Sequence, residues 1–82
     1  MEKSDISGIK VRLQFLLDEK NITVYKLAKD IEINDSVIYD FLQENNHRNL
    51  SLDMLGKISN YFEVSLFWLI KGYSFKERNK DV

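Results

Sequence analysis

Proline is absent from this chain, and apolar residues recur every three or four positions along most of its length. That spacing places apolar side chains on one face of an α-helix, and without proline nothing forces such a helix to break. Glycine, the other common helix breaker, occurs only at Gly8, Gly56 and Gly72. The pattern therefore predicts an all-α protein whose helices are joined by short polar turns.

Five stretches carry an apolar stripe, and four of them follow a residue that caps helix N-termini. The first predicted helix, residues 9–20, has its stripe at Ile9, Leu13, Leu16 and Leu17. Thr23 and Asn34 are predicted to cap short helices over residues 24–31 and 35–42. Ser51 and Ser65 cap the last two predicted helices, the fourth with inward residues Leu52, Leu55, Ile58 and Phe62, and the fifth ending at Gly72.

The length of 82 residues fits one domain, which we expect to be a compact five-helix unit over residues 9–72 with flexible termini at 1–8 and 73–82. Cysteine is absent, which excludes disulfides, thiolate metal sites and thiol catalysis. No apolar run is long enough to span a membrane, and the first residues lack the order of a signal peptide. A cytoplasmic protein is expected.

The segment ITVYKLAKDIEINDSVIYDFLQ resembles the helix-turn-helix of the Cro and phage-repressor (XRE-type) family. Thr23 lies where that family caps its second helix, and Leu27 and Ala28 lie where a large apolar residue precedes a small one. A small residue is needed because the two helices cross steeply and closely. Ile33 matches the residue of the turn that plugs the core, and Ile38 matches the inward residue of the third helix. The resemblance extends over residues 9–72 and implies a lambda-repressor-like fold.

Three positions depart from the family pattern. Glu32 stands where the turn between the second and third helices usually has glycine, and this costs about 1 kcal/mol if the turn keeps a positive φ. Glu44 replaces a glycine that often opens the next loop, and Leu17 replaces an arginine of the first helix. Leu17 enlarges the core, whereas the two glutamates oppose a close approach to DNA.

The resemblance implies that the third helix enters the major groove of DNA and that flanking segments bind phosphates. The residues implied to read base edges are Asp35, Ser36, Tyr39 and Asp40, with Val24 and Tyr25 beside them. A carboxylate in such a position can accept a hydrogen bond from cytosine N4. Asp35 also has a purely structural interpretation as a favourable charge at a helix N-terminus, and Asp40 as a solvated surface residue.

The residues implied to contact phosphates are Lys26, Lys29, Gln43, Asn45, Asn46, His47 and Arg48. Charge weakens this expectation, because residues 32–50 contain four acidic residues and one basic residue, a net charge of −3. The whole chain carries a formal charge of −1. We therefore expect weak DNA binding unless the protein dimerises.

An enzyme is not expected. His47 is the one histidine, and without cysteines or a nearby pair of carboxylates it makes a poor metal site. The chain also lacks a glycine-rich phosphate loop, and no metal or other cofactor is expected.

Two groups of apolar residues exceed what a small core needs. Regulators of the resembled family commonly pair through their last helix, and the predicted dimer interface consists of Phe67, Trp68, Ile70, Tyr73 and Phe75. Packing within one chain is the alternative for Trp68 and its neighbour Leu69. Val11 and Phe15 lie opposite the apolar stripe of the first helix, so at least one of them is expected to be exposed, as a surface for another protein.

Two functions follow from this sequence. The first is a sequence-specific, dimeric transcriptional repressor that binds double-stranded DNA. The second is a helix-turn-helix module that binds a protein, such as an antirepressor, and has little affinity for DNA.

Overall fold

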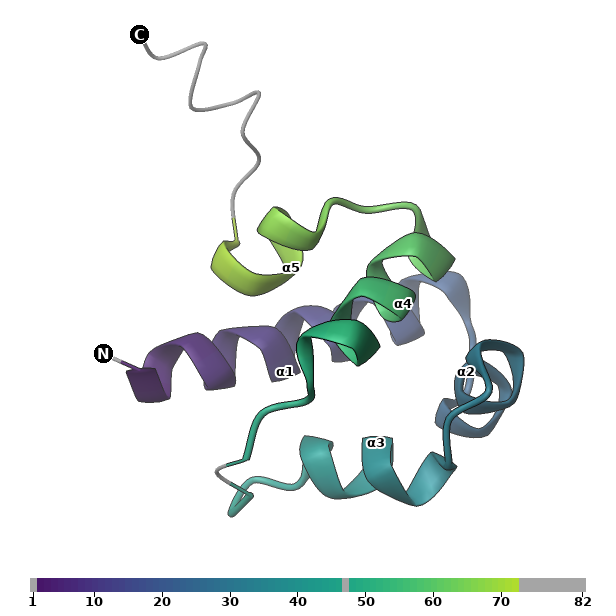
Figure 1. Cartoon of the computed structure of the whole chain (residues 1–82), viewed down its shortest axis with the longest axis horizontal. Coiled ribbons are helices and arrows are strands. Elements are labelled where there is room, and N and C mark those ends of the chain that lie inside the picture. Colours follow the sequence, from purple (N-terminus) through teal and green to yellow (C-terminus); the bar gives the residue numbers. More distant parts are fainter. Residues whose placement is uncertain (1, 47, 73–82) are drawn as a thin grey trace, which may run out of the picture.

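The computed structural model describes residues 2–46 and 48–72, and within this part of the chain it consists of five helices (Figure 1). They are α1 (Glu2–Lys20), α2 (Val24–Ile31), α3 (Asp35–Leu42), α4 (Leu52–Phe62) and α5 (Leu66–Lys71). The all-α fold and the order of the helices agree with the sequence analysis. None of the described helices is both long and apolar enough to cross a membrane.

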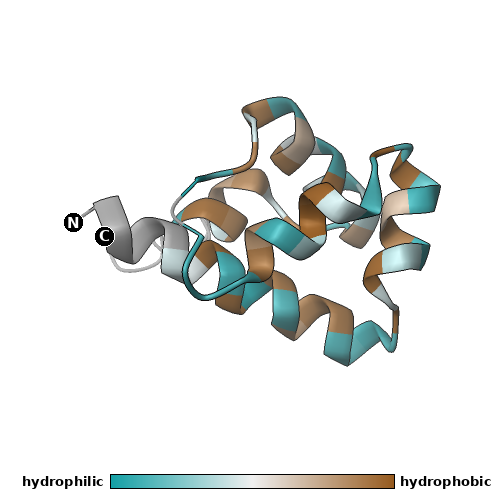
Figure 2. Ribbon diagram, turned by 90° about the horizontal axis from the view of Figure 1, so that it is seen from below, coloured by the Kyte–Doolittle hydropathy of each residue, from teal (hydrophilic) through white to brown (hydrophobic). Residues whose placement is uncertain are grey.

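The longest helix, α1, lies at the centre of the arrangement. It packs against α5 on one side and against α3 on the other, while α2 contacts both α3 and α4. In Figure 1, α5 lies above α1, α4 crosses in front of it and α3 lies below it, with α2 at one end. Figure 2 shows hydrophobic and hydrophilic residues alternating along the described helices, as amphipathic helices in a single-core domain require.

The core gathers the inward faces of all five helices. From α1 it takes the predicted stripe of Ile9, Leu13, Leu16 and Leu17, so the leucine that replaces the family's arginine does enlarge the core. The other buried apolar residues of the described chain are Leu27, Ala28, Ile38, Phe41, Leu50, Leu55, Ile58, Phe62 and Leu69. At roughly 1.5–3 kcal/mol for each large apolar side chain, this cluster is the main source of stability.

The caps that the sequence predicts are formed. The side-chain oxygens of Thr23, Asn34, Ser51 and Ser65 each accept a hydrogen bond from a backbone N–H in the first turn of α2, α3, α4 and α5. Each cap satisfies a donor that has no partner within its own helix, which is why these residues fix the helix starts.

Two predictions about the helices are corrected. The first helix begins at Glu2 and not at Ile9. The predicted start rested on the apolar stripe, and the first turns of the helix precede that stripe. Leu52 was predicted to point inward, yet it is 67% exposed. Leu52 is the first residue of α4, and the buried stripe of this helix begins one turn later, at Leu55. The predicted flexible segment 73–82 lies outside the described residues.

Arg12 fixes the end of the last helix against α1. Its Nε donates to the carbonyl oxygen of Leu69 and its Nη2 to that of Ile70, both at 2.8 Å. These are carbonyls of the last turn of α5, where a positive charge is favourable. A Cβ atom added to Gly72 would lie 2.7 Å from Arg12 Nη1, so a side chain at residue 72 would displace the guanidinium from this position.

Candidate nucleic-acid interface

The two helices α2 and α3 are joined by a tight turn that begins with two backbone hydrogen bonds to the end of α2. Glu32 adopts the left-handed conformation with φ 61°, and the next N–H, that of Ile33, donates to Ala28 O at 2.9 Å. The Glu32 N–H donates to Lys29 O at 3.3 Å, which completes a Schellman motif. Glu32 thus keeps the geometry that normally favours glycine, and the strain expected from the sequence is present.

The angle between these helices is set by the residues between them. Leu27 and Ala28 of α2 and Ile38 of α3 are all fully buried, and the methyl group of Ala28 lets the helices approach closely. Ile33, predicted to plug the core from the turn, is only half-buried. The arrangement is a helix-turn-helix that presents the opposite side of α3 to solvent (Figure 1).

The outward side of this helix pair carries most of the residues implied to read bases. Ser36, Tyr39 and Asp40 of α3 are exposed, and Tyr25 in the first turn of α2 is exposed as well. Asp35 is half-buried. Val24 is half-buried and packs against the core, so less of it is available to a ligand.

The Ser36 hydroxyl takes part in the cap of α3. It donates to Asn34 Oδ1 at 2.9 Å, and the Ser36 N–H donates to the same oxygen at 3.0 Å. Because its proton points to Asn34, this hydroxyl offers its lone pairs outward and acts as an acceptor in the free protein.

A loop of residues 43–51 follows α3 and borders an open groove of about 580 Å³ between α3 and the start of α4. Two of the amide side chains predicted to contact phosphates instead cap the end of α3: Gln43 Nε2 donates to Tyr39 O at 3.1 Å, and Asn46 Nδ2 donates to Asp40 O at 2.8 Å. Asn45 and Arg48 are exposed beside the groove. His47 lies outside the described residues.

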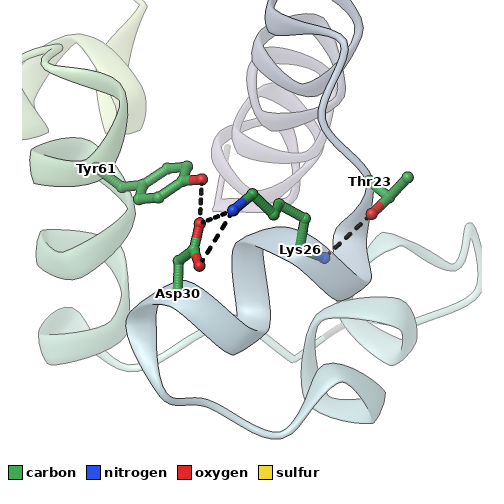
Figure 3. Close-up of polar contacts among 4 residues, drawn as sticks. All are labelled: Thr23, Lys26, Asp30 and Tyr61. Atoms are coloured by element: carbon green, nitrogen blue, oxygen red, sulfur yellow. Dashed lines mark hydrogen bonds and ion pairs between the residues drawn. The ribbon is translucent and has the colours of Figure 1, made fainter.

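Lys26, another predicted phosphate contact, belongs to a polar network between α2 and α4 (Figure 3). Its Nζ lies 3.1 Å from Asp30 Oδ2, and the Tyr61 hydroxyl donates to the same carboxylate at 2.6 Å. The Tyr61 hydrogen bond, followed by that of Lys26, lowers the pKa of Asp30, while the hydrogen bond to Asp30 raises the pKa of Tyr61. Lys26 and Lys29 are both exposed on α2, and Lys26 is paired with Asp30 in the free protein.

Three residues with important contacts did not stand out in the sequence. Tyr61 contacts Asp30 across 31 positions, and Lys10 contacts the loop after α3 across 33 and 36 positions. Arg12 reaches the end of α5 across 57 and 58 positions. All three are polar residues of helices whose partners lie far away in the chain, and local periodicity carries no information about such pairs.

Apolar side chains are exposed at two further places. On α1, Val11 is 68% and Phe15 is 52% exposed, so both members of this pair face solvent. On α5, Phe67 is 37% exposed and Trp68 and Ile70 are half-buried, whereas Leu69 belongs to the core. Tyr73 and Phe75 lie outside the described residues.

Among the described side chains, no group of three or more acidic or histidine residues is arranged to hold a metal ion. The exposed groups around α3 are hydroxyls, carboxylates, aromatic rings and amides, which suit recognition by hydrogen bonding and contact.

Comparison with known proteins agrees with this geometry. A protein-family model described as a helix-turn-helix domain matches residues 11–74, which covers most of the chain and all of α2 to α5. No curated protein and no solved structure matches this sequence.

Proposed function

Because this chain belongs to the XRE-type helix-turn-helix family, whose members are DNA-binding regulators, we propose that it is a cytoplasmic, sequence-specific transcriptional repressor that binds double-stranded DNA as a homodimer. The observation that carries the proposal is the exposed outer side of α3, flanked by the first turn of α2. A helix presented in this way fits the major groove, with its N-terminal residues at the base edges. We assign no catalytic activity to it.

Base recognition in this proposal relies on acceptors. Asp35, Asp40 and the Ser36 hydroxyl accept hydrogen bonds from exocyclic amino groups such as cytosine N4, while Tyr39 and Tyr25 provide apolar contact. Since α3 contains no basic residue, it lacks the side chains that most often bind guanine. The preferred site is therefore expected to present cytosine or adenine amino groups to α3.

Phosphate binding is assigned to the flanking segments. Lys29 and Arg48 supply exposed positive charge, and Lys26 joins them when a phosphate replaces Asp30 as its partner. Asn45 and His47 complete the set in the segment after α3, whereas the side-chain amides of Gln43 and Asn46 already donate to carbonyl oxygens at the end of α3. With so few cations, each subunit binds weakly, and dimerisation supplies the remaining affinity.

The dimer is assigned to α5. Phe67 is its exposed aromatic residue, Trp68 and Ile70 on the same helix are half-buried, and aromatic side chains are typical anchors of interfaces. The assignment also includes Tyr73 and Phe75 of the segment that follows in the sequence. A two-fold pair of this kind places its half-sites about 34 Å apart, one turn of the DNA helix.

The test is selection of bound duplexes from a random pool, followed by mobility-shift titration of the selected duplex. We expect a selected site with two-fold symmetry and an affinity that falls steeply as salt rises. Absence of any shift at low salt, with a protein that is folded by circular dichroism, would contradict DNA binding.

Two variants separate the proposed roles. Arg48→Ala should weaken binding to all sequences alike, and the slope of log affinity against log salt concentration should become smaller by about one. Ser36→Ala should instead relax the sequence preference at one base pair. If both variants have the same effect on all duplexes, the division between base and phosphate contacts is wrong.

A second candidate function is binding to a protein, which the exposed pair Val11 and Phe15 and the acidic surface of α3 favour. It predicts a folded protein that leaves every duplex unshifted.

A further inference from the structure

The amino group of Lys10 lies between two carbonyl oxygens of the loop that follows α3. Its Nζ is 2.7 Å from Gln43 O and 2.6 Å from Asn46 O, so it donates to both ends of a tight turn. The side chain is half-buried, and the Nζ atom lies 5.8 Å from the centre of the Phe41 ring. This one cation joins the central helix α1 to the far side of the helix-turn-helix.

The loop that Lys10 contacts is ordered around Asn46. The Asn46 N–H donates to Gln43 O at 3.1 Å, and its side-chain Nδ2 donates to Asp40 O. Its Oδ1 accepts from the Arg48 N–H at 3.0 Å. The position of the Arg48 backbone therefore depends on Asn46, and one of the contacts that fix Asn46 is the hydrogen bond from Lys10.

The chemistry of this position favours a cation. The end of α3 and the following turn present carbonyl oxygens with partial negative charge, and Lys10 donates to two of them. The protonated amine has three donors, of which two are directed at the loop. Because it is directed inward, Lys10 is not arranged to bind a phosphate itself.

We propose that Lys10 is a positioning residue, which holds residues 43–46 and the backbone N–H of Arg48 in the shape that contacts DNA without contacting DNA itself. The part that concerns DNA rests on the proposed function, whereas the part that concerns the loop does not. A loop held in its bound shape loses less conformational entropy on binding, so Lys10 raises affinity for every sequence equally.

The test compares Lys10→Met, which removes the donors, with Lys10→Arg, which keeps the charge and several donors. Lys20→Met is the matched control, since Lys20 is an exposed lysine at the end of α1. Hydrogen exchange of the free protein is measured at the amides of Asn46 and Arg48. For Lys10→Met we expect exchange roughly tenfold faster at these amides, because a hydrogen bond to a charged group is lost, and near wild-type exchange for the other two proteins.

DNA binding provides the second measurement. Lys10→Met should reduce affinity by a similar factor on all duplexes while leaving the slope of affinity against salt unchanged, because no phosphate contact is removed. A slope smaller by about one ion would instead make Lys10 a phosphate ligand and overturn the proposal. Unchanged exchange at Asn46 and Arg48 would overturn it as well.

The two proposals fail in different ways. If the wild-type protein binds no duplex, the proposed function is wrong, while the exchange measurement still decides whether Lys10 orders the loop. If Lys10→Met does not fold, Lys10→Gln replaces it, because glutamine keeps most of the stem and one neutral donor group. In that variant, exchange at Asn46 and Arg48 must again rise above that of Lys20→Met.

Discussion

Among the described residues, three other than glycine hold the left-handed conformation at helix ends: Asn21, Glu32 and Glu63, with φ values of 56°, 61° and 59°. Glu32 belongs to the turn of the helix-turn-helix, and a side chain in this conformation is strained by contact between its Cβ and the backbone. We expect Glu32→Gly to raise the free energy of unfolding by about 1 kcal/mol, measured by urea denaturation.

Glu44 provides the matched control for that prediction. Like Glu32 it replaces a glycine of the family pattern, but it is not among the residues of positive φ. Glu44→Gly should therefore give no gain in stability. A similar gain from both variants would show that strain at Glu32 is not the cause.

The contact between Tyr61 and Asp30 makes stability depend on pH at both extremes. The lowered pKa of Asp30 means that the contact stabilises the fold above the ordinary pKa of aspartate, about 3.9, and that this stabilisation is lost as pH falls through the lowered value. The raised pKa of Tyr61 means that its contribution is complete below about pH 10 and is lost as pH rises through the raised value.

Tyr61→Phe tests this dependence. In the variant, the pKa of Asp30, followed by NMR of its carboxyl carbon, should rise towards its ordinary value, while the Lys26 pair keeps part of the shift. The difference in unfolding free energy between wild type and variant should shrink in acid. Tyr39→Phe, a change at an exposed tyrosine of α3, should leave the titration of Asp30 as it is.

At the scale of the elements, the end of α5 depends on a close fit between Gly72 and Arg12. Gly72 has φ 90°, and a Cβ atom there would lie 2.7 Å from the guanidinium. Gly72→Ala should therefore lower the free energy of unfolding by more than about 1 kcal/mol, because it adds both backbone strain and a clash. Arg12→Met in the same background should relieve the clash and recover part of the loss.

At Gly56, substitution by alanine should have the opposite effect on the free energy of unfolding. It lies within α4, and a Cβ atom built on it has nothing within 4 Å. Gly56→Ala should stabilise the protein by about 0.5–1 kcal/mol, because alanine has the higher helix propensity. Equal effects at Gly56 and Gly72 in thermal or urea unfolding would contradict the fit described for Arg12.

The sequence predicted α2 to α5 closely because each begins at a capping side chain, whose hydrogen bond lies within four residues of itself. The start of α1 was missed because it has no apolar stripe to mark it. Leu52 was misplaced because periodicity describes one helix alone and does not say where its neighbours end. The exposed residues of α3 followed from the family resemblance, whereas Lys10 and Tyr61 depend on the packing of distant helices.

At the scale of the whole molecule, the position of Phe67 leads to a prediction about assembly. If α5 forms the dimer, Phe67→Ser should weaken self-association by tenfold or more, roughly the loss expected for an aromatic anchor, and reduce DNA affinity with it. Sedimentation velocity over a range of protein concentrations measures this. Phe15→Ser, at an exposed aromatic residue on α1, should leave the dimer intact, and the reverse result would move the interface to α1.

Lys10 and Arg12 lie two residues apart on α1, and they hold segments on opposite sides of this helix: the loop after α3 and the last turn of α5. A protease that cuts before residue 10 leaves Lys10 and Arg12 in the larger, C-terminal fragment. A protease that cuts after residue 12 removes both residues from that fragment. Limited proteolysis should therefore show a sharp limit at this point. Fragments that begin shortly before Lys10 persist, and fragments that begin after Arg12 are degraded completely.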